Sequence, residues 1–374
     1  MRDITPEIEG RLSGVGCSCH PVMPRTARAL VTEGDAPQVL LEVLKELGIS
    51  GPVALAYDEV TYSVLASSIE GFLRSRGIEV IEFSVSRADE GNALRLKELM
   101  GRASVGVAVG GGTVIDVCKL AAHWSGKPFI SVPTTLSHDG IASPVASVAF
   151  RGRSHRASVP ATGPVAVVAD AGVLSSSPRR LKAAGAGDLL AKLTALKDWE
   201  LGELHAGEIV CRRAYAAELE AIECAIDFVY GGMRDALVLL KGLLLSGAAM
   251  ALVGSSRPAS GSEHMISHQI DALGKSKGLH GEQVALATVL MSRYHQSHNG
   301  GWWRDPRFSW GSVLELLSVA GAPTSFLELG LTREDVVEAV LRAPEVRPER
   351  VTLLHLKRPG RETVSELLEE TGIC

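Results

Sequence analysis

The sequence predicts an α/β domain built on a parallel sheet, followed by an all-helical domain. Through the first half of the 374 residues, short apolar runs alternate with segments of helical spacing, a pattern typical of βαβ units. Beyond Asp170 the β-branched runs largely disappear and long amphipathic stretches take over. We therefore expect an α/β domain over residues 1–171, a helical domain over residues 172–374, and a functional cleft between the two.

The elements follow in order along the chain. Strands are expected at 51–58, 78–85, 104–112, 128–135 and 164–170, helices at 59–77, 92–100 and 113–126, and a hairpin at 143–159. Residues 173–188, rich in Ser and Gly, are expected to form a connector. Three helical stretches come next: LLAKLTALKDWELG, AYAAELEAIECAIDFVYGG and ALVLLKGLLLSGAAMALVG.

Composition restricts the class of protein. The net charge of −5, with 46% hydrophobic and 22% charged residues, argues against nucleic-acid binding as the main role. No apolar run is expected to reach the roughly 18 residues of a membrane span, and the first residues lack the apolar core of a signal peptide. We expect a cytoplasmic protein without membrane insertion, assembled as a homo-oligomer.

The six cysteines are scattered, except for the cluster Cys17-Ser-Cys-His20. Thiols and an imidazole this close together are typical metal ligands, but a second ligand pair at finger-like spacing is missing from the sequence. The favoured interpretation is therefore that these are solvated or buried thiols without a role.

Three glycines, Gly110, Gly111 and Gly112, stand where an apolar strand turns into a helix. Bare backbone and unpaired N–H groups at a helix start suit a pyrophosphate, as in Rossmann-like domains. Asp58 ends the first strand, a position from which an acid binds a ribose hydroxyl in dinucleotide folds. The triplet is not the GxGxxG fingerprint, so a plain tight turn is the alternative.

Residues 133–143, PTTLSHDGIAS, follow the next strand. The carboxyl ends of parallel strands are where such sheets bind ligands, so the hydroxyls and the carboxylate of Asp139 are candidate ligand contacts. The same residue types are also common in turns that bind nothing.

Three of the eleven histidines lie between residues 264 and 280. His264 and His268 share one face of a helix, and His280 begins a further helix. Each alone is compatible with an ordinary polar residue, but together they suit a metal site that needs one more hard ligand and an open position. Asp188 is the candidate for that ligand, and a helix N-cap is the alternative for it.

Five motifs occur in one order: GGGTVID at 110–116, PTTLSHDGIASP at 133–144, GAGD at 185–188, SGSEHMISH at 260–268 and LHGEQVA at 279–285. In these motifs the sequence resembles the superfamily of iron-type alcohol dehydrogenases, glycerol dehydrogenases and dehydroquinate synthases, over nearly the whole chain. SHDGIASP, GSEHxxxH and HGEQ most resemble its sn-glycerol-1-phosphate dehydrogenases of archaeal lipid synthesis. Asp188 stands where dehydroquinate synthases have Glu, which favours the dehydrogenase branch.

The resemblance implies a role for each matching residue. One metal ion is held by Asp188, His264 and His280, and Asp188 thereby also borders the substrate. Asp139 and His268 are the expected catalytic and substrate-contacting residues. The expected dinucleotide site, with Asp58 included, consists of Gly111, Gly112, Thr113, Val114, Ile115, Asp116, Thr134, Thr135, Leu136, Ser137 and Ser143.

The activity that the resemblance implies is reversible reduction of dihydroxyacetone phosphate to sn-glycerol 1-phosphate by NADH or NADPH. A zinc ion suits two imidazoles and one carboxylate. His138 and Lys192 are candidates for holding the substrate phosphate. The rival functions are a glycerol or polyol dehydrogenase, a dehydroquinate-synthase-like lyase, and a metal or nucleotide sensor without turnover.

Overall fold

The computed structural model describes residues 1–19, 26–152 and 156–374. Seven strands form one sheet in the order β1-β2-β9-β6-β5-β3-β4, in which every neighbouring pair except β1–β2 is parallel. A separate antiparallel hairpin consists of β7 and β8. The strands are β1 Arg2–Asp3, β2 Arg28–Thr32, β3 Val53–Tyr57, β4 Val80–Ser84, β5 Val105–Gly110, β6 Phe129–Pro133, β7 Val145–Ala149, β8 Arg156–Pro160 and β9 Ala166–Asp170.

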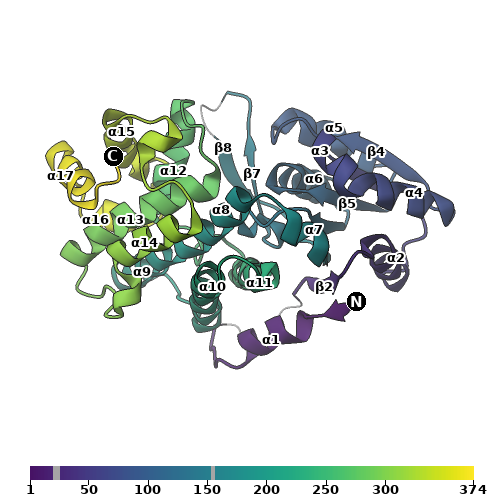
Figure 1. Cartoon of the computed structure of the whole chain (residues 1–374), viewed down its shortest axis with the longest axis horizontal. Coiled ribbons are helices and arrows are strands. Elements are labelled where there is room, and N and C mark those ends of the chain that lie inside the picture. The colour runs from purple at the N-terminus through teal and green to yellow at the C-terminus, as the bar shows by residue number, and fades with distance from the viewer. Residues whose placement is uncertain (20–25, 153–155) are drawn as a thin grey trace.

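The predicted fold class is confirmed, because all strands of the described chain end by Asp170 and helices follow to the C-terminus (Figure 1). The α-helices are α1 Thr5–Ser13, α2 Ala36–Glu46, α3 Glu59–Thr61, α4 Ser67–Ser75, α5 Glu90–Met100, α6 Gly112–Ser125, α7 Ala171–Ser176, α8 Arg179–Leu190, α9 Lys192–Ala206, α10 Arg212–Tyr230, α11 Ala236–Val253, α12 Ser262–Leu273, α13 His280–His298, α14 Trp310–Ala320, α15 Arg333–Arg342, α16 Leu353–Leu356 and α17 Arg361–Thr371.

An apolar core packs against each face of the sheet. One lies under α2 and α4 and includes Leu40, Leu55 and Ile69. The other starts beneath α5 and α6 on the opposite face and continues without interruption into the helical part, where Leu189 and Leu243 belong to it. Because one close-packed core runs through both parts, the position of the cleft between them is fixed by packing.

The predicted connector at 173–188 is wrong, since α7 and α8 occupy it. Its glycines lie inside α8 because other backbone comes too close for a side chain. A Cβ on Gly185 would stand 1.9 Å from the carbonyl oxygen of Leu136, and one on Gly187 would stand 2.7 Å from that of Gly281. These glycines therefore mark close contacts of α8 with the loop after β6 and with α13, whereas the sequence pattern indicated a break.

The expectation that no apolar run reaches membrane-spanning length is also wrong. Among the described helices, α11 has 18 residues with a mean hydropathy of 2.1, enough by length and composition to cross a bilayer. However, 67% of that stretch is buried inside the protein, and its Lys241 pairs with Glu7 and Glu220. A helix buried in this way by its neighbours is a core helix.

The N-terminal segment contacts the helical part as well as the sheet. Strand β1 pairs with β2, whereas α1 contacts α10 and α11 (Figure 1). Arg11 pairs with Glu220 at 3.2 Å, and Arg213 Nε donates to the carbonyl oxygen of Val15 at 2.8 Å. The segment thus bridges the two parts of the fold.

Candidate functional site

A cleft of about 850 Å³ opens at the carboxyl ends of the parallel strands, between the sheet and the helical part. This is where an open α/β sheet binds its ligands. Most of the residues predicted from the sequence line it, namely Asp58, Gly111, Gly112, Thr113, Asp116, Thr134, Thr135, Ser137, Asp139, Ser143, His264 and His280.

Three residues of the expected dinucleotide site do not bring their side chains to this cleft. Val114, Ile115 and Leu136 are fully buried in the apolar core. Any contact that they make with a nucleotide must therefore come from their backbone atoms, as is usual at a glycine turn and helix start.

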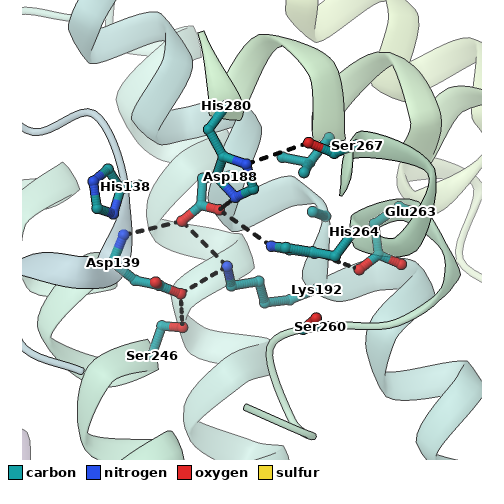
Figure 2. A network of polar contacts seen from close by, with 12 residues as sticks. His138, Asp139, Asp188, Lys192, Ser246, Ser260, Glu263, His264, Ser267 and His280 are labelled. Atoms are coloured by element: carbon teal, nitrogen blue, oxygen red, sulfur yellow. Dashed lines mark hydrogen bonds and ion pairs between the residues drawn. The ribbon is translucent and has the colours of Figure 1, made fainter. Parts of the chain in front are cut away.

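One acid and two histidines converge at the helical wall of the cleft. His264 Nε2 lies 3.7 Å and His280 Nε2 4.0 Å from Oδ1 of Asp188. The donor atoms of all three lie within 4.8 Å of one another, so a single cation can reach them together (Figure 2). Two imidazoles and one carboxylate are the donor set of a catalytic zinc site that keeps an open position, and the residues present fit such an ion.

The two imidazoles are held so that Nε2 faces this point. His264 Nδ1 lies 2.7 Å from Oε1 of the buried Glu263, and His280 Nδ1 lies 3.3 Å from Oγ of Ser267 (Figure 2). An acceptor at Nδ1 keeps the proton there and leaves Nε2 free for a metal. Burial and the neighbouring His264 lower the pKa of His280 well below its usual value, so this imidazole is neutral at pH 7.

Packing between α8 and α13 places the acid beside His280. A Cβ on Gly281 would stand 2.0 Å from the carbonyl oxygen of Ala184, so the two backbones are in direct contact there. Asp188 lies one turn further along α8, inside the helix. The alternative of an N-cap at Asp188 is therefore wrong, and the two small residues explain how its carboxylate comes within reach of both imidazoles.

A buried charge network adjoins the metal-ligand set. Lys192 Nζ lies 2.9 Å from Oδ2 of Asp139 and 3.3 Å from Oδ2 of Asp188. Asp139 Oδ2 also accepts a hydrogen bond from Ser246 at 2.8 Å (Figure 2). Burial alone raises the pKa of Asp139, but Lys192 outweighs it and holds the value at about 2. Burial raises the pKa of the nearby Glu218 to about 8, so Asp139 is charged and Glu218 protonated at pH 7.

Lys192 cannot hold a substrate phosphate, because its side chain is fully buried and its charge is paired with two carboxylates. In protein stripped of metal, Lys192→Met is expected to lower the free energy of unfolding by about 3–5 kcal/mol, since it leaves buried carboxylates unpaired. Urea unfolding measures this. The control Lys275→Met removes a surface pair, with Asp335, and should cost about 0–1 kcal/mol. Equal losses in the two variants would contradict the buried network.

His268 lies one turn from His264 on α12 but apart from the metal-ligand set. Its Nε2 is 3.3 Å from Oγ of Ser158 on the hairpin strand β8. Its ring centre is 6.5 Å from that of His280. The side chain is buried and does not itself line the cleft, but its partner Ser158 does, so a small movement of the ring would let it hydrogen-bond a substrate held beside the metal ligands.

The glycine turn lies at the sheet side of the cleft. A Cβ on Gly111 would stand 3.2 Å from Oγ1 of Thr135, whereas one on Gly112 would stand 1.7 Å from Nε2 of His138. Gly112 therefore accommodates the His138 ring as well as offering bare backbone at the start of α6. Asp58 caps α3, with its Oδ1 accepting from the N–H of Thr61 at 2.8 Å, and it lines the same end of the cleft.

Lys119, which organises the loop at the cleft, was not predicted from the sequence, because no motif singles it out. Lys119 Nζ is fully buried and donates to Asp116 Oδ1 at 3.1 Å and to the carbonyl oxygens of Gly140 and Val145, both at 2.7 Å. Asp116 also accepts from the N–H of Ser147 at 3.1 Å. The carboxylate of Asp116 therefore fixes the shape of the cleft wall as well as lining it.

The chain matches known proteins over most of its length. Residues 31–178 match the family model described as iron-containing alcohol dehydrogenase. Curated relatives named glycerol-1-phosphate dehydrogenase [NAD(P)+] include one from Pyrococcus abyssi, 37% identical with 88% of this chain and 93% of the relative covered. Another, from Hyperthermus butylicus, is 38% identical with 92% and 97% covered.

Solved structures share the fold at low identity. A probable glycerol dehydrogenase from Sinorhizobium meliloti has a TM-score of 0.73 at 17% identity, covering 92% of this chain and 95% of that one. Maleylacetate reductase from Agrobacterium tumefaciens has a TM-score of 0.72 at 17% identity, covering 94% and 97%.

The parallel sheet, the helical part and the acid-and-two-histidine group between them define an oxidoreductase of the iron-containing alcohol dehydrogenase type. Within that class the chain belongs to the glycerol-1-phosphate dehydrogenase family, because relatives of that name are 37–38% identical over about nine-tenths of the chain. The resemblance found in the sequence motifs is confirmed.

Proposed function

We propose that this protein is a zinc- and NAD(P)-dependent dehydrogenase that reduces dihydroxyacetone phosphate reversibly to sn-glycerol 1-phosphate. The observation that carries the proposal is the set Asp188, His264 and His280, which faces the glycine turn at Gly111 across one cleft. The names of the relatives supply the substrate and the cofactor. The product serves the synthesis of archaeal-type phospholipids.

The residues of the chain have separate tasks in this reaction. When bound, the metal polarises the substrate carbonyl and the reduced nicotinamide supplies a hydride. Lys192 holds the side chain of Asp139 ionised. The backbone N–H of Asp139 donates to Asp188 Oδ2 at 3.0 Å and so keeps the loop after β6 against α8. His268 holds a proton at Nε2 for the oxygen that becomes a hydroxyl. The cleft walls orient the two reactants and exclude water.

The function is tested by a stereospecific product assay with dihydroxyacetone phosphate and each reduced cofactor. We expect stoichiometric oxidation of added NADH or NADPH and formation of sn-glycerol 1-phosphate. Equal activity with unphosphorylated glycerol would favour a polyol dehydrogenase. Binding of nucleotide without net oxidation would favour a synthase that recycles its cofactor, or a sensor. Metal analysis of the active protein identifies the ion.

Arg156 is the residue that we assign to the substrate phosphate. It lines the cleft on β8, two residues before Ser158, which contacts His268. Its Nη2 donates to the carbonyl oxygen of Ser147, while its Nε has no hydrogen-bond partner within the described ranges. A guanidinium suits phosphate because it offers several donors in one plane.

Arg156→Met should therefore lower kcat/KM for dihydroxyacetone phosphate by about 10- to 100-fold, the range for a hydrogen bond to a charged group. Unphosphorylated dihydroxyacetone serves as the matched substrate, and its kcat/KM should be unaffected. A proportional loss with both substrates would show that Arg156 acts on the fold of the hairpin and not on the phosphate.

The surroundings of the six cysteines fit a cytoplasmic enzyme. All six lie in described parts of the chain and none forms a disulfide, as expected in a reducing compartment. We retain the homo-oligomer as part of the proposal, to be measured by light scattering on the purified protein.

A further inference from the structure

Three thiols from distant parts of the sequence meet beside the N-terminal segment. Cys17 Sγ lies 2.8 Å from Cys19 Sγ and 3.5 Å from Cys211 Sγ. All three sulfur atoms lie within 4.8 Å of one another. Cys17 and Cys19 follow α1, and Cys211 immediately precedes α10, 194 residues after Cys17. The structure thus supplies the ligand partner that the sequence cluster lacked.

A hydrogen bond that does not involve sulfur joins the two chain segments that carry the three thiols. Arg213, two residues after Cys211, donates to the carbonyl oxygen of Val15, two residues before Cys17, at 2.8 Å. Cys17 and Cys19 are half-buried against the apolar core, and Cys211 belongs to that core and is buried. The three thiols therefore converge because α1 and α10 are docked on each other.

We propose that Cys17, Cys19 and Cys211 bind a second, structural zinc ion that fastens the N-terminal segment to the helical part. Thiolates are the ligands preferred by structural zinc, and three of them bound at about 2.3 Å would lie roughly 3.8 Å apart. The observed separations need only a small adjustment to reach that arrangement. One position of the tetrahedron is left for a further ligand. His20, the fourth member of the sequence cluster, lies outside the described residues.

This centre differs in chemistry and place from the cleft. The cleft offers one oxygen and two nitrogen donors, whereas the cluster of Cys17, Cys19 and Cys211 offers only sulfur. None of the three cysteines lines the cleft. The ion should therefore contribute to stability, because a metal that binds only the folded state shifts the unfolding equilibrium, while turnover should not depend on it. The inference does not rest on the proposed reaction.

Metal counting on the full-length protein tests the proposal. We expect two zinc ions per chain in the purified protein, one in His280→Ala, and none in His280→Ala combined with Cys211→Ser. Cys211→Ser alone should keep one zinc ion and its turnover but unfold at a lower temperature. The matched control is Cys224→Ser, which removes a buried thiol of α10 outside the cluster and should keep two.

Cobalt substitution in His280→Ala gives a second readout that needs no cysteine variant. Cobalt bound to thiolates produces a sulfur-to-metal charge-transfer band in the near ultraviolet, and we expect this band at one cobalt per chain. Its absence, together with a single zinc ion in the unmutated protein, would overturn the proposal. So would a Cys17–Cys211 disulfide found by mass spectrometry of the protein purified under nitrogen.

Discussion

His280→Ala is expected to fold normally, to lose the metal of the cleft, and to lose turnover by at least about three orders of magnitude. Within the described parts of the chain, the imidazole is one of three side chains that converge on the proposed metal position, so its removal leaves two donors to hold the ion. Without the ion, the substrate carbonyl is not polarised, and the transition state loses several kcal/mol of stabilisation. The start of α13 stays capped, because Glu282 Oε2 still accepts from the N–H of Leu279 at 2.8 Å.

The measurement combines metal analysis, circular dichroism and steady-state kinetics. His298→Ala is the matched control, since His298 ends the same helix and contacts Tyr294, far along the helix from the cleft. That variant should keep its metal and its turnover. A His280→Ala protein that carries its full metal complement and reduces the substrate at the normal rate would refute the assignment of the ligand set.

Local sequence spacing was enough to predict half of the site. His264 and His268 share a face because both lie on α12, and His280 starts α13 as expected. The glycine turn comes directly after β5, and the loop comes directly after the neighbouring parallel strand β6. Their position side by side at one end of the sheet was therefore predictable. These predictions depend only on contacts between residues close in sequence or on the regular geometry of a parallel sheet.

Other parts of the site depend on packing that no local pattern encodes. The glycines near Asp188 indicated a break in the chain, whereas they let α8 touch the loop after β6 and α13. Lys192 was expected at the substrate phosphate, yet it is enclosed by carboxylates from two segments. The third thiol, Cys211, reaches Cys17 only because α1 docks on α10. In each case the contact joins segments that are far apart in the sequence and whose relative position is fixed by the packed core.

The roles of the two histidines on α12 are separated by the variants His264→Ala and His268→Ala. Because i and i+4 share one side of a helix, both side chains lie on the same face of α12, and His264 lines the cleft. The donor atoms that converge with Asp188 belong to His264 and His280, while His268 Nε2 contacts Ser158 on the hairpin. If His268 were a further ligand, the ion would have four protein ligands, as structural sites do, with no position open for substrate.

We therefore expect His268→Ala to retain its cleft metal and to lose turnover or substrate affinity by on the order of 10²-fold or more, the scale of a positioned proton donor. His264→Ala should instead lose the metal, because only Asp188 and His280 stay to hold it. Metal analysis of the two purified variants decides between the roles. The pH profile of kcat adds a readout that a packing defect would not change, since removal of a proton donor at His268 should flatten one limb of that profile. Metal-free His268→Ala beside a fully loaded His264→Ala would mean that the two histidines have exchanged roles.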